Sequence, residues 1–190
     1  MSSTLSAPAA RELNHTRRIE IACYMRADGL WDIEGRMVDV RPTAYYDLEQ
    51  PRAPNEPIHD MWLRLTIDGD FNVLKSEAAM PAGAYDHCPL VLPNYSRLEG
   101  LRIGPGWNKA ARERLGGVQG CTHLVEMLAQ MASAAMQAVW NQLSEDDPER
   151  GDALGIATIN TCYAYRSDGR LVARKWPDRY TGRGADNAAE

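Results

Sequence analysis

The longest helical pattern of the chain lies within residues 116–143. Its apolar residues recur at the i, i+3, i+4 and i+7 spacing of an amphipathic helix: Cys121, Leu124, Val125, Leu128, Met131, Ala132, Ala135, Met136, Val139 and Leu143. Polar residues follow the same spacing on another face: His123, Glu126, Gln130, Ser133 and Gln137. Because glycines at 116, 117 and 120 precede the apolar run, we expect the helix to begin just after them. The rest of the fold should pack against its apolar face.

Upstream of this helix, apolar and polar residues alternate with the period of two that indicates half-buried strands. The alternation predicts two strands within residues 17–41, joined by an Asp-Gly turn at 28–29. The inward residues of these two strands are Ile19, Ile21, Cys23, Met25, Trp31, Ile33 and Met37. A third strand is predicted at 58–67 and a returning strand at 71–79, around a second Asp-Gly turn. The four strands should form an antiparallel meander.

The remaining segments are predicted to form loops and shorter helices and strands. These are a proline-bearing connection at 42–57, irregular chain at 80–93, a helical turn at 95–101, a short basic helix at 107–115, an acidic loop at 144–152, and strands at 156–166 and 171–175. Residues 1–16 are predicted to form a disordered arm and 181–190 a loose tail, around a single domain at 17–180. Strands followed by helices predict the α+β class, with an antiparallel meander sheet packed against one long helix of the C-terminal half, plus short helices.

Composition excludes several classes of protein. The hydrophobic content of 44% and charged content of 25% are those of a soluble globular protein. There is neither an apolar run near the roughly 20 residues that span a bilayer nor a signal peptide pattern, so we expect a cytoplasmic protein without a membrane partner. A net charge of −5 with scattered Lys and Arg argues against nucleic-acid binding. The chain lacks the glycine motifs of nucleotide, nicotinamide and flavin sites.

Cysteine and aromatic usage add two further points. The four cysteines have no CxxC spacing, so disulfides are not expected. Five Trp and eight Tyr accompany a single Phe, and such aromatic residues suit either a pocket lining or the edge of a core.

The start of the long helix could carry chemistry. Cys121 lies where backbone N–H groups and the helix dipole lower a thiol pKa, which suits a nucleophile or a metal-binding thiolate. The alternative is that Cys121 is the first apolar residue of the buried stripe. His123 and Glu126 are spaced i, i+3, so the carboxylate could orient the ring. The alternative is an ordinary surface pair.

A second candidate segment is the start of the third predicted strand. His59 has inward parity on an otherwise apolar face, and Asp60 follows it after a proline-bearing loop. His59 is therefore either a core residue or a member of a site. The candidate catalytic residues are His59, His123, Cys121, Glu126 and Asp60.

Two further sets of residues could bind a metal ion or a substrate. Cys121, His123 and His59, completed by a carboxylate such as Asp28 or Asp60, would suit Zn²⁺ or Fe²⁺, although no single spacing is a metal signature. Candidates for binding a substrate are Tyr45, Tyr46, Trp62, Trp107 and Arg64. The arginine could bind a carboxylate or phenolate, with a surface salt bridge as the alternative.

Four motifs together resemble a bacterial family of domains of unknown function. They are RADGLWDIE at 26–34, HDM at 59–61, LRIGPGW at 101–107 and GCTHL at 120–124. The resemblance covers residues 17–180 and implies a link to bacteria that degrade aromatic and steroid compounds, which favours catabolism. A weaker likeness is to the iron–sulfur scaffold fold, which also places a cysteine at a helix start. This chain lacks the three-cysteine set of that family, which makes sulfur transfer a minor alternative.

These observations favour a small-molecule catabolic enzyme. We expect a lyase, cofactor-independent or metal-assisted, that does acid–base chemistry on an aromatic substrate of the lignin-derived type and releases a small fragment such as formaldehyde. His123 or His59 would be the base, and a tyrosine or acidic residue the proton donor. The alternative is an accessory protein that binds metal or sulfur through Cys and His without catalysis of its own. A third hypothesis is a binding subunit that forms a homo-oligomer through the long helix.

Overall fold

The computed structural model describes residues 5–46, 49 and 51–182. They fold as two compact units, residues 1–135 and 136–190, with the boundary inside the long helix α2 (Thr122–Asp146). Residues 5–15 of the predicted arm contain no helix or strand, and the first strand begins at Thr16. The predictions for residues 1–4 and 183–190 lie outside the described residues. No helix in the described part of the chain has the length and apolar character needed to cross a membrane.

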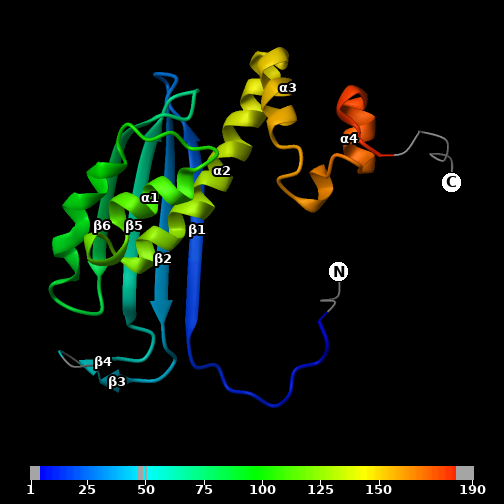
Figure 1. The fold of residues 1–190 in the computed structure, drawn as a ribbon. Coiled ribbons are helices and arrows are strands. Elements are labelled where there is room, and N and C mark those ends of the chain that lie inside the picture. Colours follow the sequence, from blue (N-terminus) through cyan, green and yellow to red (C-terminus); the bar gives the residue numbers. More distant parts are fainter. Residues whose placement is uncertain (1–4, 47–48, 50, 183–190) are drawn as a thin grey trace. The chain divides into compact units, whose positions relative to one another are not determined.

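The first unit contains one antiparallel sheet of four strands in the order β1-β2-β5-β6 (Figure 1). The strands are β1 (Thr16–Met25), β2 (Trp31–Val40), β5 (Pro57–Ile67) and β6 (Val73–Ala82). The predicted four-stranded meander and the α+β class are therefore confirmed. Between β2 and β5, β3 (Tyr45–Tyr46) and β4 (Pro51–Arg52) form a short hairpin. The proline-bearing connection predicted at 42–57 therefore contains a short hairpin that was not predicted, since Pro51 can occupy a strand that has a partner on one side only.

Cross-strand pairing arranges the inward side chains in rows. Each row contains one residue from each of β1, β2 and β5. Successive rows are Cys23–Ile33–Leu65, Ile21–Gly35–Leu63 and Ile19–Met37–Met61. The β2 and β5 members of these rows other than Gly35 are almost completely buried, so the apolar alternation along the strands forms the core.

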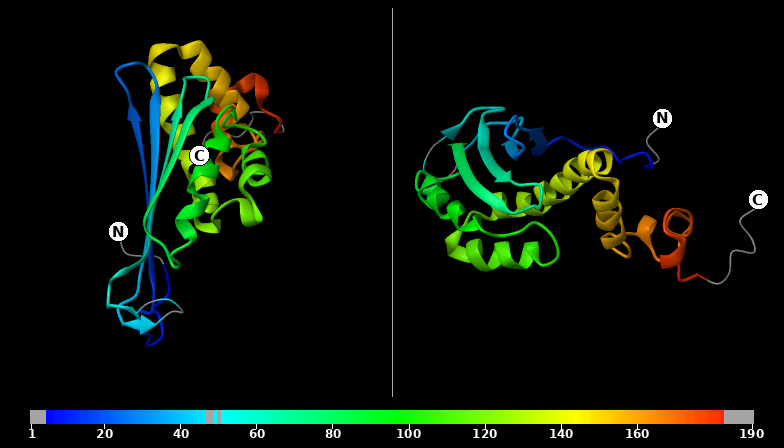
Figure 2. Two further views of the ribbon diagram at one scale, coloured as in Figure 1. Left: turned by 90° about the vertical axis from the view of Figure 1, so that its left-hand side faces the viewer. Right: turned by 90° about the horizontal axis from the view of Figure 1, so that it is seen from above.

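Helices cover one face of this sheet, as the side view of Figure 2 shows. They are the 3-10 helix η1 (Cys88–Leu98), α1 (Trp107–Leu115) and the first part of α2. The α1 bounds match the prediction, and η1 is longer than the predicted turn at 95–101 and includes part of the segment predicted as irregular. The buried residues of α2 in this unit are Leu124, Met127, Leu128, Met131, Ala132 and Ala135. α2 approaches β2 so closely that a Cβ atom at Gly35 would lie 2.9 Å from the sulfur of Met131.

The second unit is helical. After α2 come α3 (Pro148–Ala157), the 3-10 helix η3 (Tyr163–Tyr165), α4 (Arg170–Lys175) and the 3-10 helix η4 (Pro177–Arg179). The predicted loop at 144–152 and the predicted strands at 156–166 and 171–175 were therefore wrong. Asp147 caps α3 by accepting a hydrogen bond from the Arg150 N–H, and proline is favoured at the first helical position. Gly155 then lets Trp140 and Trp176 pack against α3, since a Cβ atom there would clash with both rings.

Candidate functional site

The apolar rows of the sheet end in a polar row where β2 ends and β5 begins. After the row Ile19–Met37–Met61, the next inward residues are Arg17 of β1, Asp39 of β2 and His59 of β5. The Asp39 side chain is only 1% exposed and that of His59 is 12% exposed. Strand pairing therefore places a cation, an anion and an imidazole side by side at one end of a buried face. We call Arg17, Asp39 and His59 the Asp39 row.

Asp39 is the centre of this row. Arg17 donates two hydrogen bonds to its carboxylate, from Nε to Oδ1 and from Nη2 to Oδ2, both at 2.8 Å. Nδ1 of His59 lies 2.8 Å from Oδ2, and Nε2 of His15 lies 3.5 Å from Oδ1. Burial alone would raise the pKa of Asp39, but the hydrogen bonds from Arg17 and His59 outweigh it and lower that pKa to about 2.

The charge of Asp39 determines the tautomer of His59. A carboxylate with a pKa near 2 is ionised at neutral pH and can only accept hydrogen bonds. The proton between the two groups must therefore be carried by Nδ1 of His59. This assignment leaves Nε2 with a free lone pair in the neutral ring.

The first turn of α2 brings a second histidine and a thiol to this row. The rings of His59 and His123 lie 4.3 Å apart between centroids. Burial lowers the pKa of His123, and the nearby His59 and Arg17 lower it further, which favours the neutral ring. Its Nδ1 lies 3.8 Å from the Cys121 sulfur. Glu126, which is mostly exposed, lies 3.7 Å from Arg17.

η1 fixes the residue that precedes α2. The buried Tyr95 hydroxyl accepts a hydrogen bond from the Cys121 N–H at 3.1 Å and donates one to the Cys121 carbonyl at 3.2 Å. Burial raises the pKa of Tyr95 far above its usual value, so the hydroxyl stays protonated. Asn94 donates to the Gln119 carbonyl at 2.9 Å. These bonds hold the thiol and His123 next to the sheet.

The structure therefore brings together four of the five predicted catalytic residues: His59, His123, Cys121 and Glu126. Asp60 lies apart from them, because alternation along β5 turns it to the opposite face, where it forms a two-bond ion pair with Arg36. Asp28, the other carboxylate considered for a metal, is bound to Arg26 in the turn between β1 and β2.

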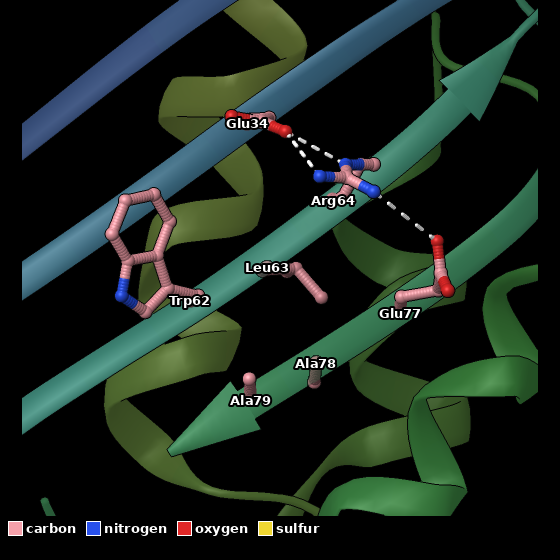
Figure 3. Close-up of a pocket in the computed structure, with 7 residues that line it drawn as sticks. All are labelled: Glu34, Trp62, Leu63, Arg64, Glu77, Ala78 and Ala79. Carbon is pink, nitrogen blue, oxygen red and sulfur yellow. Dashed lines mark hydrogen bonds and ion pairs between the residues drawn. The ribbon is translucent and has the colours of Figure 1, made fainter. Parts of the chain in front are cut away.

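The five predicted substrate-binding residues were Tyr45, Tyr46, Trp62, Trp107 and Arg64. Trp62 and Arg64 lie on the outer face of the sheet, beside a shallow hollow of about 280 Å³ (Figure 3). Arg64 pairs there with Glu34 at 2.6 Å. Trp107 is buried in the core and donates to the Leu128 carbonyl.

The two tyrosines among these five residues lie in β3. The Tyr45 ring is 5.3 Å from the Arg41 guanidinium, and Tyr46 is 74% exposed.

Sequence reasoning missed Asp39, Arg17 and His15. The first two were detectable, because Asp39 continues the inward parity of Ile33 and Met37, and Arg17 that of Ile19 and Ile21. His15 precedes β1 and carries no such signal. As a result, three of the four histidines of the chain gather around Asp39. The fourth, His87, stacks on Tyr85 in the loop before η1.

Two residues of the row, together with His123 of α2, form a set of groups suited to a metal ion. Asp39, His59 and His123 each offer one ligand atom, and these atoms lie within 4.8 Å of one another. Two imidazoles and a carboxylate suit Zn²⁺ or Fe²⁺. Cys121, which was predicted as a ligand, is not a member of this set.

Comparison with family models identifies a family for this chain. A family model described as "Protein of unknown function (DUF2889)" matches residues 15–137. The matched range contains the four sequence motifs and the residues around Asp39, namely His15, Arg17, His59, Cys121, His123 and Glu126. The resemblance predicted a family domain that reaches residue 180, but the match ends near the boundary of the first unit. Searches among curated proteins and among solved structures found no match.

Proposed function

Since this chain belongs to the DUF2889 family, which is described only as of unknown function, we propose a function from the site geometry: a small-molecule lyase that works by general acid–base catalysis. The observation that carries the proposal is the 2.8 Å bond between His59 and the ionised, buried Asp39. This contact gives His59 a fixed orientation and a fixed tautomer, which is the role that a buried aspartate has beside a catalytic histidine.

His59 is the proposed general base. Its Nε2 accepts a proton from the substrate, and the imidazolium that forms is stabilised by the Asp39 carboxylate on the other side of the ring. Arg17 keeps this carboxylate ionised through its two hydrogen bonds. Without Arg17, burial would favour the protonated form of Asp39.

His123 is the proposed partner of this base. The centroid distance of 4.3 Å makes it unfavourable for both rings to be charged. The pair therefore carries one added proton at a time, and the proton can be returned to the substrate after the bond is broken. A site that removes and returns a single proton suits an elimination or a carbon–carbon cleavage.

The proposed substrate is an aromatic compound of the lignin-derived type that bears a hydroxymethyl group. His59 takes the hydroxyl proton, the adjacent carbon–carbon bond breaks to release formaldehyde, and the remaining carbanion takes the proton back from His59. The aromatic class follows from the family resemblance.

The test compares two histidine variants in a formaldehyde-release assay on a panel of aryl propanoid alcohols. We expect His59→Gln to lower kcat by at least about 100-fold, the usual contribution of a general base. The matched control is His87→Gln, which makes the same change outside the candidate site and should leave kcat unaltered. Equal activity in the two variants, on a compound that the wild-type protein cleaves, would rule His59 out as the base.

Metal binding is the second candidate function, and it is favoured by the grouping of Asp39, His59 and His123 within 4.8 Å. Asp39, His59 and His123 would hold the ion, and its binding would compete with the bonds that Arg17 and His59 make to the Asp39 carboxylate. A bound Zn²⁺ or Fe²⁺ would act as a Lewis acid or would serve an accessory role without catalysis.

Elemental analysis of the tag-free protein distinguishes the two candidates. A metal site predicts near one equivalent of Zn or Fe per chain, which is lost in both His59→Gln and His123→Gln. Retention of the metal in Cys121→Ser would select the ligand set with Asp39 over the predicted set with Cys121. A metal content unaffected by both histidine variants would argue against a site at this position.

A further inference from the structure

β1 is an edge strand with an exposed side. Among the described residues it pairs only with β2, over the full length of Thr16–Met25 (Figure 1). Half of the backbone groups of a strand point away from its single neighbour, and a ten-residue edge is therefore a template for another strand. Beyond Arg17, its inward side chains are apolar but incompletely covered, with Ile19 36% exposed and Met25 60% exposed.

We propose that β1 pairs antiparallel with β1 of a second copy of the chain, around a two-fold axis at Ile19. The pairing joins the two four-stranded sheets edge to edge into one continuous sheet. It places the exposed Ile19 side chains of the two copies against each other on the inward face. A symmetric contact of this kind closes on itself and forms a dimer.

Side-chain parity limits the register of this pairing. Opposite residues in an antiparallel pair share a face, so the axis must pass through a residue that faces itself. An axis at Arg18 would place two arginines directly opposite each other, and an axis at Glu20 would do the same with two glutamates. Like charges in such positions are destabilising. The axis at Ile19 instead places Arg18 of each copy opposite Glu20 of the other.

The axis at Ile19 is also favoured over one at Ile21. An axis at Ile21 would pair Glu20 with Ala22 and would leave both charges without a partner across the interface. In the proposed register, Glu20 lies between Arg18 of the second copy and Arg36, its opposite residue on β2. Charge complementarity therefore selects one register of this edge.

This pairing also extends the row of the candidate site. Arg17 lies two residues before the axis, so it faces Ile21 of the second copy. The row His59–Asp39–Arg17 would then continue into the second chain, which would shield the Arg17–Asp39 pair from water. The inference does not depend on the proposed lyase activity, because it concerns only the edge that adjoins the site.

The test uses sedimentation of the full-length protein over a range of concentrations. We expect a dimer for the wild-type chain and at least about tenfold weaker self-association for Arg18→Glu, because two attractive pairs become repulsive. Arg18 suits this change because its partner on β2 is the uncharged Val38. The double variant R18E/E20R exchanges the two charges and should restore the dimer.

Cross-linking tests the axis itself. Under mild oxidation Ile19→Cys should form a disulfide-linked dimer, whereas Ile21→Cys and the wild-type protein, with its native cysteines, should not. A monomer mass at all concentrations would overturn the proposal. A dimer that is unaffected by Arg18→Glu would show that self-association uses another surface. A disulfide-linked dimer of Ile21→Cys, without one of Ile19→Cys, would overturn the register.

Discussion

Asp39→Asn is expected to reduce the proposed activity by at least about 100-fold and to destabilise the first unit by about 2 kcal/mol at neutral pH. The amide has the shape of the carboxylate, but it can no longer accept two bonds from Arg17 together with one from His59. It also lacks the charge that fixes the Nδ1 proton of His59, and a histidine in the wrong tautomer is a poor base. Activity is measured by formaldehyde release and stability by urea unfolding.

The stability loss should depend on pH in a defined direction. The pKa of Asp39 is lowered from its ordinary value of 3.8 to about 2 in the folded protein, so folding favours the ionised form. This stabilisation is fully present above about pH 4 and is lost as pH falls toward 2. The lowered pKa corresponds to about 2 kcal/mol. The difference between the wild type and Asp39→Asn should therefore shrink as the pH is lowered from 6 to 3.

Asp60→Asn is the matched control for this variant. Asp60 accepts a similar pair of hydrogen bonds from Arg36, at 3.0 and 2.8 Å, but on the outer face and without a histidine. Its loss should leave formaldehyde release unchanged and cost less stability, since the pair with Arg36 is more exposed to solvent. Equal effects of the two variants on activity would contradict a special role for the Asp39 row.

The sequence was sufficient to predict the sheet because alternation is a local signal. Strands with one buried face repeat every two residues, and the same count that placed Met61 inward also placed His59 inward. The sequence did not determine the pairing register, that is, which residues of neighbouring strands lie opposite each other. The Arg17–Asp39–His59 row depends on the pairing register of three strands, and Asp39 was overlooked because a charged residue interrupts an apolar face.

The second unit shows where local patterns are insufficient. Residues 148–157 are helical although Gly151 and Gly155 lower helix propensity and the segment has many polar residues. The glycines are needed for close packing, since a Cβ atom at Gly151 would lie 2.6 Å from Ser144 of α2 and one at Gly155 would lie 2.9 Å from the Trp140 ring. Such a contact joins residues from different helices, and no periodicity within α3 can reveal it.

Gly35→Val is expected to destabilise the first unit by about 2 kcal/mol. A Cβ atom at this position would lie 2.9 Å from the Met131 sulfur and 3.2 Å from Cδ1 of Ile21, so the larger valine must displace α2 or β1. Overpacking of this kind costs about 1–3 kcal/mol, which exceeds the gain of less than about 1 kcal/mol from the higher strand propensity of valine. Urea unfolding measures the change.

The control for this prediction is Gly69→Val, in a turn where a Cβ atom would meet no neighbour within 4 Å. Its effect should stay within about 0.5 kcal/mol. Combining Gly35→Val with Met131→Ala removes the clashing side chain, so the double variant should be more stable than the sum of the two losses predicts, by about 1 kcal/mol. Additive losses would show that Met131 does not limit the space at Gly35.

The same contact links packing to the site. Met131 lies on α2 downstream of His123, so a valine that lifts the helix from the sheet also moves the His123 ring away from His59. We therefore expect Gly35→Val to weaken the proposed activity even at temperatures where the protein remains folded, whereas Gly69→Val should not. Full activity of folded Gly35→Val would mean that the 4.3 Å contact between the two rings is not required for catalysis.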